Sequence, residues 1–207
     1  MLIETLAWHA GGGFQRLDRH LARLAASAET LGFAFDRRQT EQALAAAVRR
    51  LDEPHLRVRL TLGRTGELNV ETASFEPQHA GTIWTAIIAA QRLDALDPLL
   101  RHKISKRDIY DLGRAEAQRV GADESLFLNQ RDELCEGGIT SLFIEAEGGL
   151  LTPPLECGLL AGVLRQELLD CGKAREAVLT LNDLKAAQRW YLGNSLRGLI
   201  PARLHTG

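Results

Sequence analysis

The stretch RLDRHLARLAASAETLGF, residues 16–33, carries the clearest periodic pattern in the sequence. Its apolar side chains recur at intervals of three and four residues, which predicts an amphipathic helix. We expect Asp18 to cap the start of this helix and Gly32 to end it. A second, alanine-rich helix is predicted over residues 39–51. The polar face of the first helix carries three arginines, for which the pattern predicts exposure to solvent: Arg16, Arg19 and Arg23.

Strand patterns follow these helices. Residues 55–73 alternate apolar and polar side chains around a Gly63–Gly66 turn, which predicts a hairpin. Residues 82–90 are mostly apolar and predict a buried strand, and residues 91–101, with Pro98, predict a linker. We therefore expect an α+β fold with mixed sheets. Its predicted parts are a small α/β lobe (residues 1–90), the linker (91–101) and a larger lobe (102–207), with one of the later strands at residues 177–181.

The composition excludes several classes of protein. The chain has 207 residues, a formal net charge of -2 and 45% hydrophobic residues, so nothing predicts binding to nucleic acid or to an anionic membrane. No apolar run is long enough for a membrane span. The three cysteines, Cys135, Cys157 and Cys171, match no metal-binding or disulfide spacing, so we expect no metal and a reducing, cytoplasmic location.

The segment HKISKRDIY, residues 102–110, contains a candidate nucleophile. The amine of Lys103 can form an imine with an aldehyde if burial or the neighbouring cations Lys106 and Arg107 lower its pKa. Taken alone, the segment is more typical of a solvated basic turn. Its interpretation therefore depends on the rest of the chain.

Three later segments contain candidate binding groups. ELCEGGITSLFIEAEGG (133–149) places Glu136 before a glycine pair, where an acid could keep a pyridine ring protonated or simply face solvent in a hairpin. PPLECGLLAGVLRQELL (153–169) runs from a glycine-marked loop into a helix, so it is either a phosphate site or an ordinary junction. WYLGNSLRG (190–198) offers Asn194 and Ser195 as donors, and a plain turn after a strand is equally compatible.

Taken in order, these segments resemble the fold-type-IV group of pyridoxal-phosphate enzymes, and most closely its aminodeoxychorismate lyases. The matching segments are LIETL (2–6), DRHLARLAASAETLGF (18–33), HKISKRDIYD (102–111), LCEGGITSLF (134–143), LTPPLECGLLAGVLR (151–165), WYLGNSLRG (190–198) and IPARL (200–204). The resemblance covers nearly the whole chain. It implies pyridoxal 5′-phosphate as cofactor, a small lobe joined to a larger pseudo-barrel lobe, and a homodimer.

The resemblance also implies roles for individual residues. Lys103 matches the Schiff-base lysine, and Glu136 matches the acid that pairs with the pyridine nitrogen. Arg23 matches the arginine that holds the phosphate, which would turn it inward, against the pattern. The remaining matches are the backbone amides of Val163 and Leu164 and the turn of Asn194 and Ser195 for the phosphate, Thr5 for the substrate, and Arg107 near the ring hydroxyl.

The implied reaction is the conversion of 4-amino-4-deoxychorismate to 4-aminobenzoate and pyruvate. The alternatives are an aminotransferase acting on branched-chain or D-amino acids, because the same residues serve both reactions, and a relative with an impaired site. The sequence departs from the family pattern at three places. The family usually has a strand and a glycine-aspartate turn before the segment that begins here at LIETL, Leu164 replaces a common threonine, and Lys106 stands where many relatives have asparagine.

Overall fold

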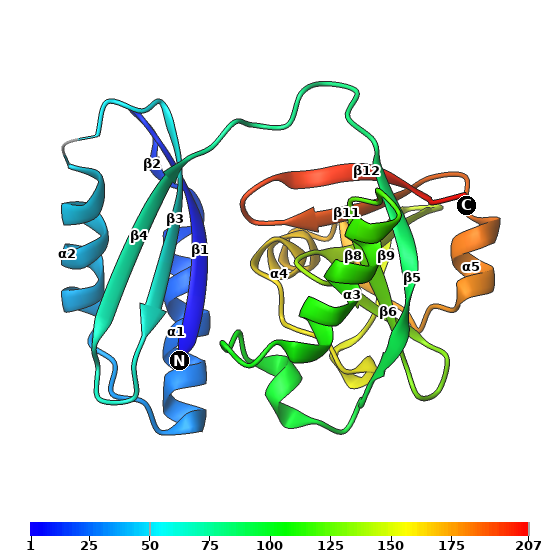
Figure 1. Ribbon diagram of the computed structural model, residues 1–207, viewed down its shortest axis with the longest axis horizontal. Coiled ribbons are helices and arrows are strands. Elements are labelled where there is room, and N and C mark those ends of the chain that lie inside the picture. The colour runs from blue at the N-terminus through cyan, green and yellow to red at the C-terminus, as the bar shows by residue number, and fades with distance from the viewer. Residues whose placement is uncertain (50, 207) are drawn as a thin grey trace. The chain divides into compact units, whose positions relative to one another are not determined.

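The structure is a computed structural model that describes residues 1–49 and 51–206 (Figure 1). Arg50, which belongs to the helix predicted over residues 39–51, and Gly207 lie outside the described residues. The chain divides into two compact units. The first comprises Met1–Gln78 and His102–Ser105, and the second comprises His79–Arg101 and Lys106–Gly207.

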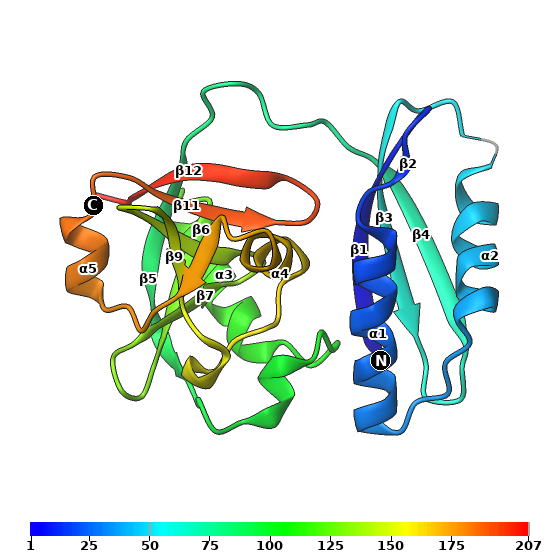
Figure 2. The same ribbon diagram turned by 180° about the vertical axis from the view of Figure 1, so that it is seen from behind.

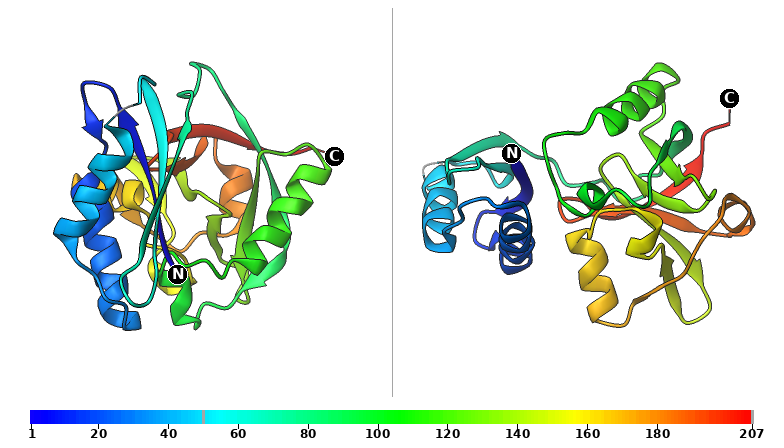
Figure 3. Two further views of the ribbon diagram at one scale, coloured as in Figure 1. Left: turned by 60° about the vertical axis from the view of Figure 1, so that its left-hand side comes forward. Right: turned by 90° about the horizontal axis from the view of Figure 1, so that it is seen from below.

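The first unit is a four-stranded antiparallel sheet with two helices. The strand order is β2-β1-β3-β4. The strands are β1 (Leu2–His9), β2 (Gly13–Phe14), β3 (His55–Leu62) and β4 (Leu68–Ser74), and the helices are α1 (Leu17–Leu31) and α2 (Arg37–Val48). Both helices cover the same face of this sheet, as the right-hand view of Figure 3 shows.

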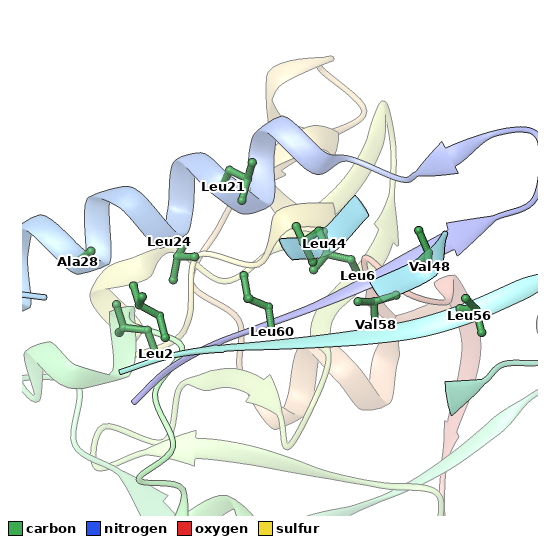
Figure 4. Packing of buried hydrophobic residues seen from close by; sticks show 11 residues of the cluster. Leu2, Leu6, Leu21, Leu24, Ala28, Leu44, Val48, Leu56, Val58 and Leu60 are labelled. Atoms are coloured by element: carbon green, nitrogen blue, oxygen red, sulfur yellow. The ribbon is translucent and has the colours of Figure 1, made fainter. Parts of the chain in front are cut away.

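Alternation along the strands explains why the helices pack on one face. Leu2 and Leu6 of β1 and Val58, Leu60 and Leu62 of β3 point to the same side. There they form one buried cluster with the apolar stripes of the two helices (Figure 4), which contribute Leu21, Leu24, Ala28, Leu44 and Val48. Gly32 ends α1 in a left-handed conformation, φ 70°, as predicted.

The second unit is built on an eight-stranded sheet with the order β10-β9-β8-β11-β12-β5-β6-β7. An additional pairing of β8 with β7 joins six of these strands into a closed, barrel-like arrangement. The strands are β5 (Trp84–Leu93), β6 (Glu124–Asn129), β7 (Leu134–Gly137), β8 (Ser141–Ala146), β9 (Gly149–Thr152), β10 (Ala174–Glu176), β11 (Trp190–Asn194) and β12 (Gly198–Leu204). The predicted α+β fold with a larger pseudo-barrel lobe is therefore confirmed.

Three α-helices accompany this sheet: α3 (Asp108–Arg119), α4 (Val163–Asp170) and α5 (Leu181–Ala186). Helix α3 packs Tyr110 against Phe127 of β6. Helix α4 lies beside β11 (Figure 2) and packs Leu164 against Phe143 of β8. Two short 3-10 helices, Pro98–Arg101 and Leu155–Cys157, lie in the connections. No helix among the described residues has the length and hydropathy needed to cross a membrane.

The observed units differ from the predicted lobes at two places. Strand β5, predicted within the small lobe, pairs with β12 and β6 and so belongs to the second sheet. The chain then returns to the first unit for His102–Ser105 before it re-enters the second at Lys106. An apolar strand has the same sequence pattern whether it ends one sheet or begins the next, so the pattern could not show where the first unit ends and the second begins.

Two local predictions were wrong. Helix α1 begins after Arg16, which adopts φ 54°, and Asp18 lies within its first turn and does not cap it. Leu17, the first residue of the helix, is partly buried and packs on the first core. No strand forms over residues 177–181. Residues Ala174–Glu176 take the place beside β9, and Thr180 makes only an isolated bridge to Glu133.

Candidate functional site

Three of the predicted binding segments meet around Ser141 in the second unit. Ser141 opens β8 and lies opposite Glu136 of β7 on one side and Gly193 of β11 on the other. Gly162, at the start of α4, approaches so closely that a Cβ atom there would lie 2.5 Å from Ser141 Oγ. The EGG, AGV and LGNS motifs are therefore neighbours in space.

Glu136 occupies an irregular position in its strand. Leu126 of β6 faces Gly137, and Leu128 faces Leu134, so Phe127 alone opposes two residues of β7, Cys135 and Glu136. A bulge of this kind re-aims the side chains that follow it. The carboxylate of Glu136 accepts a hydrogen bond of 2.7 Å from the Tyr110 hydroxyl of α3.

A second donor binds the same carboxylate oxygen. The backbone N–H of Leu160 donates to Glu136 Oε1 at 3.2 Å, on the oxygen that also accepts from Tyr110. The Glu136 side chain is only 6% exposed. It is thus a buried acid with a defined orientation, and the alternative of a solvent-facing hairpin glutamate is wrong.

The loop after Glu136, residues 137–140, is bound by other residues through its backbone carbonyl groups and through its backbone N–H groups. Arg107 Nη2 donates to the carbonyl of Gly138, and Asn194 Nδ2 donates to the carbonyl of Ile139 at 3.2 Å. Arg107 and Asn194, two predicted site residues, therefore bind the loop that follows the third, Glu136. Arg107 also places its guanidinium over the Tyr110 ring, 4.8 Å from the ring centre.

Glu124 of β6 holds the N–H groups of the same loop. Its Oε1 accepts from the N–H of Ser125 and of Gly138, and its Oε2 accepts from the N–H of Ile139 and the hydroxyl of Thr140. Burial raises the pKa of Glu124, and these four hydrogen bonds oppose that shift. A Cβ atom on Gly138 would lie 3.0 Å from Glu124 Oε1, a tighter contact than most Cβ atoms make, so glycine at this position favours the close approach of the loop.

The start of α4 has the character of an anion site. Gly162 precedes the helix with extended backbone, φ −61° and ψ 136°, and no side chain caps it. The amides of Val163 and Leu164 belong to the first turn, so they have no acceptor within the helix, and the helix dipole adds partial positive charge there. Gly193 lies against this turn, since a Cβ atom on it would be 3.0 Å from Leu164 Cδ2.

The turn after β11 is ordered by its own asparagine. Asn194 Oδ1 accepts from the N–H groups of Leu196 and Arg197 at 3.1 and 2.9 Å. Because Nδ2 binds Ile139, the Asn194 side chain ties this turn to the 137–140 loop. Ser195 follows and is buried.

Lys103 belongs to the first unit, on a segment that pairs with the start of β1. The N–H of Ile3 donates to the Lys103 carbonyl at 2.8 Å, and Leu2 forms an isolated bridge with Ile104. His102 adds a contact of 3.0 Å between Nδ1 and the Ser27 hydroxyl of α1. The backbone of Lys103 is therefore fixed by pairing with β1, and its side chain is half-buried.

The same pairing sets the direction of the Lys103 side chain. Ile104 packs with Leu2 on the helix-covered face. Neighbouring residues of an extended segment alternate, so Lys103 projects to the opposite face of the sheet. Thr5 of β1 has the same parity as Ile3 and lies on that face too. The first unit thus places Lys103 and Thr5 on a common face.

Arg23 turns inward from α1, as the resemblance implies and against the pattern. Its Nε and Nη2 donate to the two carboxylate oxygens of Glu4 at 2.8 and 2.6 Å. His20 Nδ1 lies 2.7 Å from Glu4 Oε2, and Glu4 is 1% exposed. Burial opposes ionisation of Glu4, but Arg23 and His20 outweigh it and lower its pKa to about 2. Arg23 thus reaches Glu4 from the helix side of β1.

Reasoning from the sequence missed three residues of these networks: Tyr110, Glu124 and Glu4. Tyr110 lies seven residues after Lys103 in helix α3, and Glu124 begins strand β6. Neither position signals a polar contact. Glu4 gave a usable signal, since it interrupts the apolar parity of Leu2 and Leu6 on a strand whose even residues face the core.

The donor groups of the second unit fit pyridoxal phosphate. Uncapped helix amides beside a glycine cradle suit a phosphate, and a buried carboxylate suits a pyridine N–H. Within residues 1–49 and 51–206, no group of three or more His, Cys, Asp or Glu side chains could hold a metal ion.

Comparisons with known proteins show what the chain is similar to. A family model described as "Amino-transferase class IV" matches residues 1–204. A Schizosaccharomyces pombe protein named "Putative aminodeoxychorismate lyase" is 30% identical over 203 residues, which is 95% of this chain and 86% of that protein.

Two solved structures extend the comparison. The crystal structure of a "Putative amino-acid aminotransferase" from Mesorhizobium loti matches with a TM-score of 0.95 and 47% identity over 99% of both chains. A branched-chain amino acid aminotransferase from Thermobaculum terrenum, solved in its PLP form, matches with a TM-score of 0.84 and 20% identity over 98% of this chain and 76% of that one.

Proposed function

The chain belongs to the class IV aminotransferase family, which depends on pyridoxal phosphate, and from this premise we propose that it is an aminodeoxychorismate lyase. The reaction is the conversion of 4-amino-4-deoxychorismate to 4-aminobenzoate and pyruvate. The observation that carries this choice of reaction is the likeness to the fission yeast protein, which extends over 95% of this chain.

The second unit binds the cofactor in this proposal. When bound, pyridoxal phosphate supplies an aldehyde that captures an amine and a protonated ring that accepts electrons from the adjacent carbon. Glu136 accepts the N–H of that ring. The first-turn amides of Val163 and Leu164, with the turn of Asn194 and Ser195, donate to the phosphate.

Lys103 would hold the cofactor and would move the proton. Its amine takes the proton from the amine-bearing carbon of the substrate and returns it to the departing enolpyruvate, so that pyruvate leaves and the ring becomes aromatic. Four peptide units separate Lys103 from Arg107, so their Cα atoms are at most about 14 Å apart whatever the placement of the two units. Chain connection therefore limits how far the Cα atom of Lys103 can lie from that of Arg107.

The remaining roles follow the same proposal. Arg23 adds a cation to the phosphate, and its pairing with Glu4 sets the orientation of the guanidinium. Arg107 lies near the ring hydroxyl, and Thr5, on the face of Lys103, contacts the substrate. By analogy with the family, the active form is a homodimer in the cytoplasm. Light scattering of the purified protein tests whether it is a dimer.

A product assay tests the reaction. The purified protein, loaded with pyridoxal phosphate and given 4-amino-4-deoxychorismate, should release 4-aminobenzoate and pyruvate in equal amounts. Lys103→Ala should abolish both products, and Lys106→Ala, a change at the exposed neighbouring lysine, should preserve them. Equal activity of the Lys103→Ala variant would overturn the assignment of the lysine.

The second candidate is an aminotransferase acting on branched-chain or D-amino acids. It is supported by the name of the Mesorhizobium loti relative, which is 47% identical. The same residues serve a proton transfer between the substrate α-carbon and the cofactor, so only products separate the two reactions. Formation of a 2-oxo acid from an amino acid, without any 4-aminobenzoate, would favour this candidate. Failure to form either product would indicate an impaired relative.

A further inference from the structure

Tyr110 binds the predicted ring-binding acid, Glu136, through its hydroxyl group. It lies on α3, and its hydroxyl donates to Glu136 Oε1 at 2.7 Å. Burial, and then the charge of Glu136, raises the pKa of Tyr110 well above its usual value. Tyr110 therefore remains a neutral hydrogen-bond donor over the whole working range of pH.

The surroundings of Tyr110 hold its hydroxyl in place. Its ring meets the Phe127 ring edge-on, with centroids 5.2 Å apart and an interplanar angle of 69°. Arg107 lies over the ring at 4.8 Å, and the side chain is only 8% exposed. A ring packed between an aromatic edge and a guanidinium has little freedom to move its hydroxyl.

The geometry at Glu136 indicates that the hydrogen bond from Tyr110 orients the carboxylate of Glu136. Both donors, the Tyr110 hydroxyl and the Leu160 N–H, act on Oε1 from two different parts of the second unit. Two donors on one oxygen restrict rotation of the carboxylate. A donor also stabilises the ionised carboxylate and lowers its affinity for a proton.

We propose that Tyr110 is a positioning residue, whose hydroxyl fixes the orientation of the Glu136 carboxylate and keeps the shared proton on the ring nitrogen of the cofactor. This role rests on the proposed function, in which Glu136 accepts the N–H of that ring. Without the Tyr110 hydroxyl, Glu136 competes better for the proton, and the ring withdraws electrons less strongly.

The test compares Tyr110→Phe with Tyr191→Phe. Phenylalanine preserves the packing of Tyr110 and removes only the hydroxyl. Tyr191, the other tyrosine of the chain, packs near α4 and serves as the matched control. Each holoenzyme is prepared with cofactor labelled with ¹⁵N in the ring, and the ring-nitrogen resonance is measured at one pH, together with kcat, KM and the unfolding midpoint of the cofactor-free protein.

In Tyr110→Phe the ring-nitrogen resonance should move toward that of an unprotonated pyridine. The expected kcat is about tenfold lower, with KM within about twofold, because one hydrogen bond to a charged group is lost from the reacting state. The cofactor-free Tyr110→Phe protein should still unfold cooperatively, at a midpoint lowered by a few degrees at most, and the Tyr191→Phe variant should stay close to the wild type in all four measurements.

Two other outcomes contradict the role in distinguishable ways. A wild-type resonance and wild-type kcat in Tyr110→Phe overturn the role of Tyr110 and leave the proposed function intact. Failure of the wild-type protein to take up cofactor at Lys103 overturns the proposed function together with this role.

Discussion

The replacement Glu124→Gln tests how the 137–140 loop is held. The substitution keeps the size of the side chain and changes one carboxylate oxygen to NH₂. Oε1 accepts from the N–H of Ser125 and of Gly138, and Oε2 accepts from the N–H of Ile139 and the hydroxyl of Thr140. In either orientation, the new NH₂ group therefore faces two former donors.

The two orientations have different costs. With NH₂ in place of Oε1, two backbone N–H groups lose their acceptor. With NH₂ in place of Oε2, the Thr140 hydroxyl can rotate to accept, and only the Ile139 N–H is left without a partner. A buried unsatisfied N–H costs about 1–3 kcal/mol, and loss of the charge weakens the remaining hydrogen bonds, so we expect a total of about 2–4 kcal/mol.

Hydrogen exchange at the Gly138 and Ile139 amides measures this cost where it arises. A loss of about 2 kcal/mol corresponds to protection lower by about 30-fold, because 1.4 kcal/mol is a factor of ten. Glu145→Gln is the control, since its side chain is 45% exposed and lies 3.8 Å from Arg189. Unchanged protection of both amides in Glu124→Gln would refute the reasoning.

Two further predictions concern the stability of the first unit at acid pH and the close contact between Gly162 and Ser141. The pKa of Glu4 is lowered from 4.5 to about 2, so its ionisation stabilises the first unit above pH 4.5 and loses this effect as the pH falls toward 2. This lowering of the pKa corresponds to about 3 kcal/mol of unfolding free energy. In Glu4→Gln, the unfolding free energy measured by urea titration should therefore fall less steeply between pH 4.5 and pH 2. A fall as steep as that of the wild type would contradict the role of Glu4. Gly162→Ala introduces a Cβ atom 2.5 Å from Ser141 Oγ and should weaken cofactor binding about tenfold, while Gly12→Ala, with no contact under 3.8 Å, should bind normally in a fluorescence titration. Equal affinities of the two variants would contradict the placement of α4.

Much of the fold could be predicted because local pattern and packing agree. The even residues of β3 and the stripe of α1 face one core, and Gly32 ends the helix where a left-handed residue is needed. The boundary of the units could not be predicted, because the return of His102–Ser105 to β1 is a tertiary pairing without a pattern of its own.

The candidate site was predictable only through the order of its motifs. Each motif alone is typical of a turn or a junction, and Ser141, which brings three of them together, has no distinctive spacing. The bulge that re-aims Glu136 depends on the pairing of β6 with β7, which the sequence does not encode locally. Side-chain contacts over long sequence separations, such as Tyr110 to Glu136 and Arg23 to Glu4, are invisible to periodicity.

The most direct test of the central claim is to map the bond between protein and cofactor. The chain contains four lysines, Lys103, Lys106, Lys173 and Lys185. After incubation with pyridoxal phosphate, borohydride reduction and proteolysis, mass spectrometry should find the added pyridoxyl group on the peptide that contains Lys103, at that residue. A group found on another lysine, or on none, would contradict the account.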